Sequence, residues 1–285
     1  MIDSLLLVVP GIIWGASFLF IAEGLEAVSP TGVAFVRIFV GFLTLSLVPA
    51  VRRPIQRSDR ARVGVLGVIW LAFPLCMFPF AEQHVSSALA GMLNGATPIF
   101  AALVASALAR QAPSRRVALG LAVGFAGAIL IALPGLAGLG EMRGQARGVL
   151  MILAALVSYA FAYSLARPLQ QRNGALPVVW RALGWALLLT LPFGAPAIAH
   201  ARWTAASLGS LVALGALGTG VAYAVLATAA GRFGATRASS NNFIIPVVSL
   251  LLGVLVRHEQ VSSLSIAGAG VCLLGAWLIR PRAAE

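Results

Sequence analysis

Long apolar runs, separated by short polar or Gly- and Pro-containing breaks, dominate the chain. A helix needs about 20 predominantly apolar residues, at about 1.5 Å of rise per residue, to cross a bilayer. The runs that approach this length cover residues 2–22, 31–51, 63–81, 86–109, 117–134, 148–166, 177–195, 207–229, 238–256 and 262–280. The pattern therefore predicts an all-α integral membrane protein with ten transmembrane helices and no separate soluble domain.

The composition of the chain agrees with this class. Charged residues make up 10% of the 285 positions and hydrophobic residues 60%, whereas a soluble domain carries about 25% charged residues to cover its surface. The net charge of +12 would suggest a nucleic-acid partner in a soluble protein. In a membrane protein, the charge must first be compared with the topology.

The positions of the arginines explain this charge. If the N-terminus lies in the cytoplasm, fourteen of the twenty arginines fall in inner loops and the C-terminal tail, and four fall in outer loops. This asymmetry follows the positive-inside rule. We therefore expect a multi-pass protein embedded in a lipid bilayer, with both termini in the cytoplasm and no nucleic-acid partner.

The two halves of the chain resemble each other at a shift of 148 residues. The shift aligns Asn94 with Asn242, Pro98 with Pro246, Gly120 with Gly268 and Gly127 with Gly275. Because five helices is an odd number, the second copy must be inverted relative to the first. We predict a first repeat at 1–134, a connecting loop at 135–147 and an inverted repeat at 148–285, arranged around a central cavity. Many secondary transporters have this architecture.

Several short motifs carry a family resemblance. They read WGASF at 14–18, FVRIF at 35–39, ATPIF at 96–100 and ATRASSNNFIIPVVSLLLGVLVRHE at 235–259. In this order and spacing they resemble the drug/metabolite transporter superfamily, EamA type, and most of all its bacterial aromatic amino acid exporter branch. The resemblance implies a ten-helix exporter of amino acids or other metabolites in a bacterial inner membrane. In one departure, the acidic residue that the family places after the ninth helix, here Glu259, is Gln111 in the first half.

Two aromatic stripes are candidates for a substrate site. Trp14 and Phe18 are four residues apart with Ser17 beside them, and Tyr159 and Tyr163 repeat the spacing in the sixth helix. Residues four apart share one helical face, so the stripes could face each other across the cavity. Aromatic faces with a few polar tips suit an amino acid with an apolar side chain. Ordinary helix packing is the alternative for each residue.

Phe78, in the third apolar run, is a further aromatic candidate for the substrate site. Packing is again the alternative.

An Asn–x–x–x–Pro pattern occurs once in each half. Asn94 precedes Pro98, and Asn242 precedes Pro246, in the interiors of the fourth and ninth predicted helices. A proline in a helix interior removes a backbone hydrogen bond and forces a kink. We predict that each pattern forms a hinge in the cavity wall, with the amide available to a substrate amino or carboxylate group. In the alternative, each amide satisfies the interrupted backbone.

Charged residues inside the predicted membrane region are few. Arg37 and Arg181 lie within the second and seventh helices, where snorkelling or structural pairing is favoured and capture of a substrate carboxylate stays open. All eight acidic residues lie at helix ends or in loops. We therefore expect a carrier without an ion-coupling site, which moves substrate down its own gradient. A relay through Glu82 and His84 is the alternative.

The remaining patterns limit the class of function. No hydrolase, metalloprotease or phosphate-binding motif occurs, so we expect neither an enzyme nor a metal or cofactor. Small residues at 120–127 and 268–270 favour close helix packing within one subunit, hence a monomer rather than a homodimer. We expect an exporter of large neutral or aromatic amino acids that works by alternating access. An exporter of other metabolites or drugs and a passive channel are the alternatives.

Overall fold

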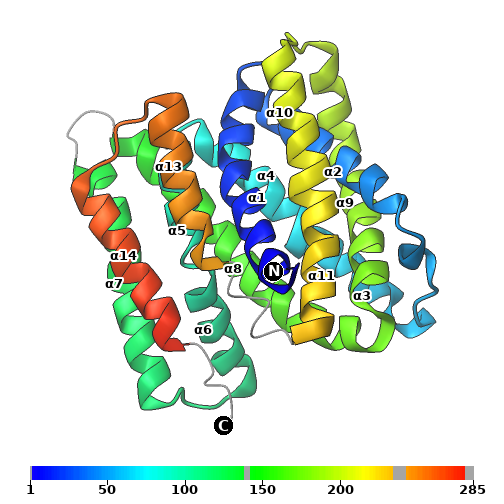
Figure 1. Cartoon of the computed structure of the whole chain (residues 1–285), viewed down its shortest axis with the longest axis horizontal. Helices are drawn as coiled ribbons and strands as arrows, with labels where there is room; N and C mark the ends of the chain where they lie inside the picture. The colour runs from blue at the N-terminus through cyan, green and yellow to red at the C-terminus, as the bar shows by residue number, and fades with distance from the viewer. Residues whose placement is uncertain (1, 138–141, 234–241, 280–285) are drawn as a thin grey trace.

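A computed structural model describes residues 2–137, 142–233 and 242–279. All regular elements in these ranges are helical, and none of the residues described there forms a strand (Figure 1). The elements are α1 (Ile2–Leu25), α2 (Pro30–Ser46), η1 (Pro49–Arg52), η2 (Arg57–Asp59), α3 (Arg60–Leu66), η3 (Gly67–Ala72), α4 (Phe73–Glu82), α5 (Ser87–Asn94), α6 (Thr97–Ala109), α7 (Arg115–Ala137), α8 (Met142–Asn173), α9 (Ala175–Ala199), α10 (Ala205–Gly215), η4 (Ala216–Val221), α11 (Ala222–Phe233), α13 (Ile245–Arg257) and α14 (Ser263–Ile279).

Seven helical segments among the described residues are long and apolar enough to cross a membrane. Three further apolar helices, α2, α13 and α14, are shorter. The all-helical, membrane-spanning class expected from the sequence is therefore confirmed. The total of ten transmembrane helices and their inverted arrangement stay predictions.

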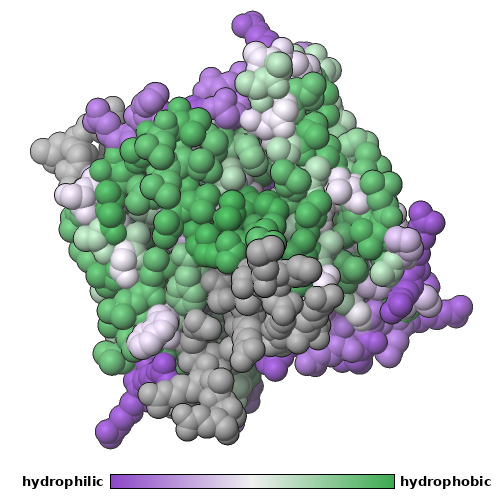
Figure 2. Space-filling view, in the orientation of Figure 1, coloured by the Kyte–Doolittle hydropathy of each residue, from purple (hydrophilic) through white to green (hydrophobic). Residues whose placement is uncertain are grey.

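Polar residues collect at two ends of the bundle, and apolar side chains cover the middle of the face seen in Figure 2. One end carries the turn between α1 and α2, and we call it the α1–α2 end. The other end contains the arginine-rich segment 52–62, in which Asp59 pairs with Arg172 of α8 at 2.9 Å. We call it the basic end. A belt of apolar side chains between two polar ends is the surface expected of a protein in a bilayer.

Helices α7 and α14 pack side by side at one edge of the molecule (Figure 1). A Cβ atom on Gly127 would lie 2.6 Å from the Cα of Cys272, and one on Gly268 would lie 2.7 Å from the backbone nitrogen of Ile131. The two backbones approach so closely because these positions lack side chains. Of the glycines predicted to pack within one subunit, Gly120, Gly124, Gly127 and Gly268 do so here, whereas Gly270 faces open space.

The two candidate hinge prolines do not lie inside continuous helices, contrary to the sequence-based expectation. Pro98 lies in the first turn of α6, after a break at residues 95–96, and Pro246 lies in the first turn of α13. Proline has no backbone N–H, and its ring clashes with the preceding turn, so a helix restarts at the residue instead of passing through it. Gly95 packs against the ring of Pro246, which brings the break at residues 95–96 next to the start of α13.

Two of the spanning segments contain a π-helical stretch. The stretches are η3, between α3 and α4, and η4, between α10 and α11. Each packs against another long helix, η3 against α9 and η4 against α2. A π-turn leaves backbone carbonyls free to accept other donors and occurs often at functional sites.

Candidate functional site

Seven aromatic side chains form a continuous series of ring contacts between helices of the bundle, in which Tyr163 is exposed and the other six are buried or half-buried. Neighbouring ring centroids lie between 5.5 and 6.3 Å apart. The order is Trp14, Tyr223, Trp70, Tyr163, Tyr159, Phe78 and Phe18. These spacings lie in the range in which aromatic pairs attract each other. We call these residues the aromatic chain. It joins α1, η3, α4, α8 and α11.

The aromatic chain contains all five aromatic residues that the sequence singled out. Trp70 and Tyr223, which connect the two predicted stripes, were missed. Trp70 contacts both Tyr163 and Tyr223, at 6.3 and 5.5 Å between centroids. Trp70 could have been found from its spacing of eight residues from Phe78, because this spacing places both near one helical face. Tyr223 had no local signal.

The π-helical stretches supply hydrogen-bond acceptors to the helices beside them. Trp14 Nε1 donates to the carbonyl oxygen of Gly218 in η4 at 2.8 Å, and Ser158 Oγ donates to the carbonyl oxygen of Ile69 in η3 at 2.6 Å. Ser17, the polar residue predicted beside Trp14, is buried and donates to the carbonyl of Ile13 on its own helix. Its hydroxyl therefore already has a backbone acceptor.

Arg37 does not snorkel but lies paired in the protein interior, which is the structural pairing that the sequence favoured beside snorkelling. Its side chain is buried, and Nε donates to Thr219 Oγ1 of η4 at 3.1 Å. Thr219 packs against Gly41, one turn further along α2, so the Arg37 side chain runs away from the nearer end of its helix. Arg181, its sequence counterpart, is half-buried and donates to the carbonyl of Val51 near the basic end.

The two candidate asparagines lie at the helix breaks. Asn94 is the last residue of α5, and its carbonyl oxygen accepts a 2.6 Å hydrogen bond from Thr97 Oγ1. Asn242 lies in the short turn before α13 and is half-buried. Within the described ranges, no hydrogen bond joins either side chain to the aromatic chain. Their assignment to the substrate site stays a prediction.

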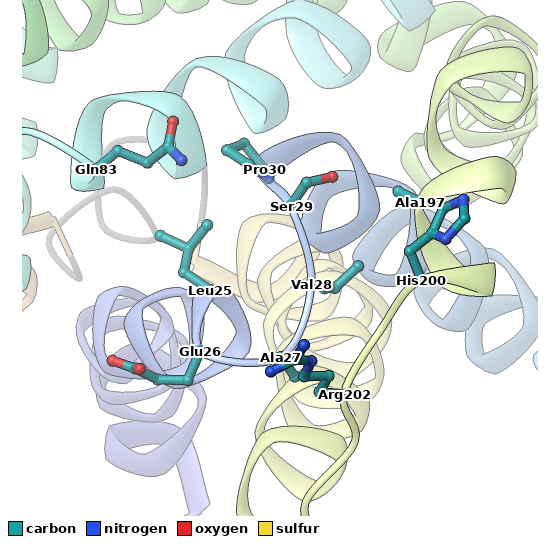
Figure 3. Close-up of a pocket in the computed structure, with 10 residues that line it drawn as sticks. All are labelled: Leu25, Glu26, Ala27, Val28, Ser29, Pro30, Gln83, Ala197, His200 and Arg202. Carbon is teal, nitrogen blue, oxygen red and sulfur yellow. The ribbon is translucent and has the colours of Figure 1, made fainter.

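Two adjoining cavities of about 430 Å³ each open at the α1–α2 end. The first lies between the α1–α2 turn, Gln83 and the residues that follow α9 (Figure 3). The second is lined by Glu82, Ser87, Arg257 and Glu259. Leu25, Glu26 and Gln83 line both. The cavities thus form one polar vestibule beside the outer turns of α1, α4 and α13.

Ion pairs at the vestibule tie α13 to α1. Arg257 at the end of α13 pairs with Glu23 of α1 and, at 3.1 Å, with Glu26. The pair with Glu23 is one-quarter to one-third exposed, so water screens it only in part. This contact holds two helices together at the mouth of the bundle.

Glu259 caps the N-terminus of α5. Its carboxylate accepts from the backbone nitrogens of Ser87 at 3.0 Å and Ala88 at 2.9 Å, and from Ser87 Oγ at 2.8 Å. A carboxylate at a helix N-terminus is stabilised by free N–H groups and the helix dipole. His258, with φ of 54°, turns the chain so that Glu259 reaches α5. The acidic residue singled out by its position after the ninth helix is therefore a structural cap.

Glu82 is at a helix end, as predicted, yet its carboxylate points into the protein. Both carboxylate oxygens are buried and have no hydrogen-bond partner among the described residues. His84, its predicted relay partner, packs beside Gly148 of α8 instead. Burial of an unpaired carboxylate is costly, so this side chain needs a functional explanation.

Comparison with known proteins agrees with the membrane fold. A model of the EamA-like transporter family matches residues 1–133 and 146–280 of the chain. A solved crystal structure superposes with a TM-score of 0.65 at 17% identity, over 97% of this chain and 95% of the other. At this identity, the solved structure supports the fold alone.

Several curated proteins are similar along almost their whole length. A probable terminal-alkyne amino-acid exporter from Streptantibioticus cattleyicolor is 25% identical over 97% of this chain and 92% of its own length. An uncharacterized transporter from Archaeoglobus fulgidus is 23% identical, over 93% of this chain and 94% of its own length. The uncharacterized inner membrane transporter YedA of Escherichia coli is 27% identical, over 94% and 87% respectively.

Proposed function

The chain belongs to the EamA-like transporter family, and we propose that it exports amino acids with large neutral or aromatic side chains across a bacterial inner membrane. The aromatic chain carries this proposal. Seven rings in contact, with a buried arginine beside them, provide an apolar surface and a charged group at one place. Substrate sites combine such apolar surfaces with a few placed polar groups.

A similar protein supports the choice of substrate class. The relative from Streptantibioticus cattleyicolor is named a probable amino-acid exporter. An amino acid with a large apolar side chain would bury that side chain among the rings of Phe78, Tyr159 and Trp70. Placement in the aromatic exporter branch is part of this proposal, and so is the bacterial inner membrane.

Transport would occur by alternating access between two inverted halves. The break at residues 95–96 before Pro98 supports this mechanism, because it divides a spanning segment and lies against Pro246 at the start of α13. Broken helices at the interface of two repeats are a common feature of secondary transporters. In this conformation, the ion pairs of Arg257 would hold the α1–α2 end partly closed.

The shift of 148 residues also relates two features of the backbone. Arg110 and His258, which are 148 positions apart, are the non-glycine residues with positive φ among those described, at 51° and 54°. Both end a helix in the left-handed conformation, α6 and α13 respectively. The correspondence supports the predicted pair of repeats.

Transport in liposomes tests the proposal. Purified protein is reconstituted, and efflux of radiolabelled Trp, Phe, Met and Thr is measured with Trp14→Ala and, as control, Trp277→Ala, an exposed tryptophan outside the aromatic chain. We expect saturable efflux of Trp and Phe that Trp14→Ala reduces about tenfold or more, whereas the control resembles wild type. Movement of an unrelated metabolite but none of these amino acids would contradict the proposal.

Two further measurements separate the mechanism from its alternatives. A passive channel would show neither saturation nor acceleration by substrate on the opposite side, and a carrier shows both. A requirement for an imposed proton gradient would contradict transport driven by the substrate gradient alone.

A further inference from the structure

Beside the aromatic chain lie a buried arginine, Arg37, and a half-buried glutamate, Glu82, whose carboxylate oxygens are buried, and neither has an ion-pair partner among the described residues. Arg37 is 7% exposed, and no acidic side chain in the described part of the chain pairs with it. Its one hydrogen bond there goes to a neutral hydroxyl, Thr219 Oγ1. The buried carboxylate oxygens of Glu82 also lack a partner among these residues. A buried guanidinium or carboxylate without an ion-pair partner is unfavourable, so a ligand that supplies both partners would stabilise this site.

Both side chains lie beside residues of α1 that belong to or adjoin the aromatic chain. The Arg37 guanidinium lies beside Gly218, which packs against Ser17 and whose carbonyl accepts from Trp14. Phe18, the next residue of α1, contacts Phe78, which lies one helical turn before Glu82 on α4. A ligand between the two charges would therefore also contact aromatic side chains.

The other charged groups around Glu82 are already compensated. Arg257 and Glu259 line the same cavity as Glu82. Arg257 forms ion pairs with Glu23 and Glu26, and Glu259 accepts three hydrogen bonds at the start of α5. Arg37 and Glu82 are thus the two groups here that still lack an ion-pair partner, and a ligand could supply one to each.

We propose that Arg37 and Glu82 form a receptor for the two charged groups of a zwitterionic α-amino acid. The Arg37 guanidinium donates charge-assisted hydrogen bonds to the ligand carboxylate, and the Glu82 carboxylate accepts from the ligand ammonium group. The vestibule cavity that Glu82 lines opens at the α1–α2 end, so a ligand would reach Glu82 first from that end. The inference rests on the proposed function and deepens it, because it requires both charges on the substrate.

Three ligands that differ by one charged group test the receptor. Binding of L-phenylalanine, phenethylamine and 3-phenylpropionate to the purified protein is followed by intrinsic tryptophan fluorescence. The second compound lacks the carboxylate, and the third lacks the amino group. The variants are Arg37→Gln and Glu82→Gln. Their matched controls are Arg181→Gln, the sequence counterpart near the basic end, and Glu26→Gln, an exposed acid at the vestibule.

The expected result is a crossed pattern of losses. Arg37→Gln weakens L-phenylalanine binding by about 10- to 100-fold, the cost of a charge-assisted hydrogen bond, and leaves phenethylamine unchanged. Glu82→Gln weakens L-phenylalanine binding to a similar degree and leaves 3-phenylpropionate unchanged. The control variants retain the wild-type preference for L-phenylalanine over both analogues.

Uniform effects would overturn the receptor. Equal weakening of all three ligands by either variant would indicate a structural role, and unchanged discrimination in both variants would exclude the two side chains from binding. A Glu82→Gln variant that alters only the response to a proton gradient would also overturn it. If a Gln variant does not fold, Arg37→Lys and Glu82→Asp are tested instead, because they keep the charge. These variants should keep the preference for L-phenylalanine over both analogues. Loss of that preference in folded variants contradicts the proposal.

The same measurements separate this inference from the proposed function. Wild-type protein that binds no amino acid would refute the proposed function. Wild-type protein that binds L-phenylalanine, with discrimination that neither variant changes, would refute the receptor alone.

Discussion

The indole nitrogen of Trp14 donates a 2.8 Å hydrogen bond to the carbonyl oxygen of Gly218 in a π-helical turn. Ser158 makes the corresponding bond to Ile69 in the other π-helical turn. Ser158 follows Trp14 by the same 144 positions that separate Arg181 from Arg37. Each half therefore donates a side-chain hydrogen bond to a π-helical turn. Only in the first half is the donor an aromatic residue, Trp14, whose ring also contacts Tyr223.

Substitution of Trp14 by Phe should separate the structural role of its hydrogen bond to Gly218 from a role in substrate binding. The variant leaves the Gly218 carbonyl unpaired, at a cost of about 1 to 3 kcal/mol in stability, and alters the aromatic chain. Ser158→Ala loses the equivalent bond and leaves the chain of rings intact. We expect both variants to lower the thermal unfolding temperature, and only Trp14→Phe to reduce phenylalanine efflux in liposomes. Equal transport defects in both would argue against a role of Trp14 in the site.

Removal of the Glu259 cap should destabilise the bundle. Glu259→Ala leaves two backbone N–H groups of α5 without their acceptor, and loss of a helix cap costs about 0.5 to 2 kcal/mol. Thermal unfolding of the purified protein in detergent should show the loss. Gln111→Ala, at the matching and exposed position of the first half, serves as control and should be neutral. A similar loss in both variants would disagree with the cap.

The α7–α14 contact should tolerate no added methyl group. Gly127→Ala would place a Cβ atom 2.6 Å from the Cα of Cys272, and overpacking of this kind costs about 1 to 3 kcal/mol. Gly270→Ala, on α14 itself, has open space at the same position of the side chain. It should be neutral or slightly stabilising, because alanine is the better helix former. Unfolding temperatures that do not differ between the two variants would contradict the packing.

Loss of the Arg257 ion pairs should open the vestibule. Arg257→Gln removes the charge that links α13 to Glu23 of α1 and to Glu26 in the turn that follows it. A cysteine placed at Ala22, which lines the second cavity, should then react faster with a membrane-impermeant maleimide. Arg202→Gln is the control, since that arginine reaches the α1–α2 turn through its backbone nitrogen. An unchanged labelling rate would show that these ion pairs do not restrict access.

Both termini should lie on the cytoplasmic side. The arginine-rich basic end contains Arg52–Arg62 and Arg172, and the positive-inside rule places such an end in the cytoplasm. A reporter that is active only in the cytoplasm should be active after residue 285 and inactive when inserted in 135–147. The reverse pattern would invert the proposed orientation.

Periodicity in the sequence was sufficient to predict the helical membrane class and the face that several side chains share. Runs of apolar residues predicted the all-helical membrane class, and a spacing of four placed Trp14 with Phe18 and Tyr159 with Tyr163 on common faces. Glycine spacing predicted the close packing of α7 and α14. These features are local, so a single stretch of chain contains the information for each.

Only the tertiary structure determined which residues each helix face packs against. Trp70 and Tyr223 are far apart in the chain and join the aromatic residues only because η3, α8 and α11 pack together. Arg37 turns inward because Thr219, 182 residues away, offers an acceptor there. The carboxylate of Glu82 is buried by helices distant in sequence. A helical period specifies a direction from its own axis, and only packing determines the partner in that direction.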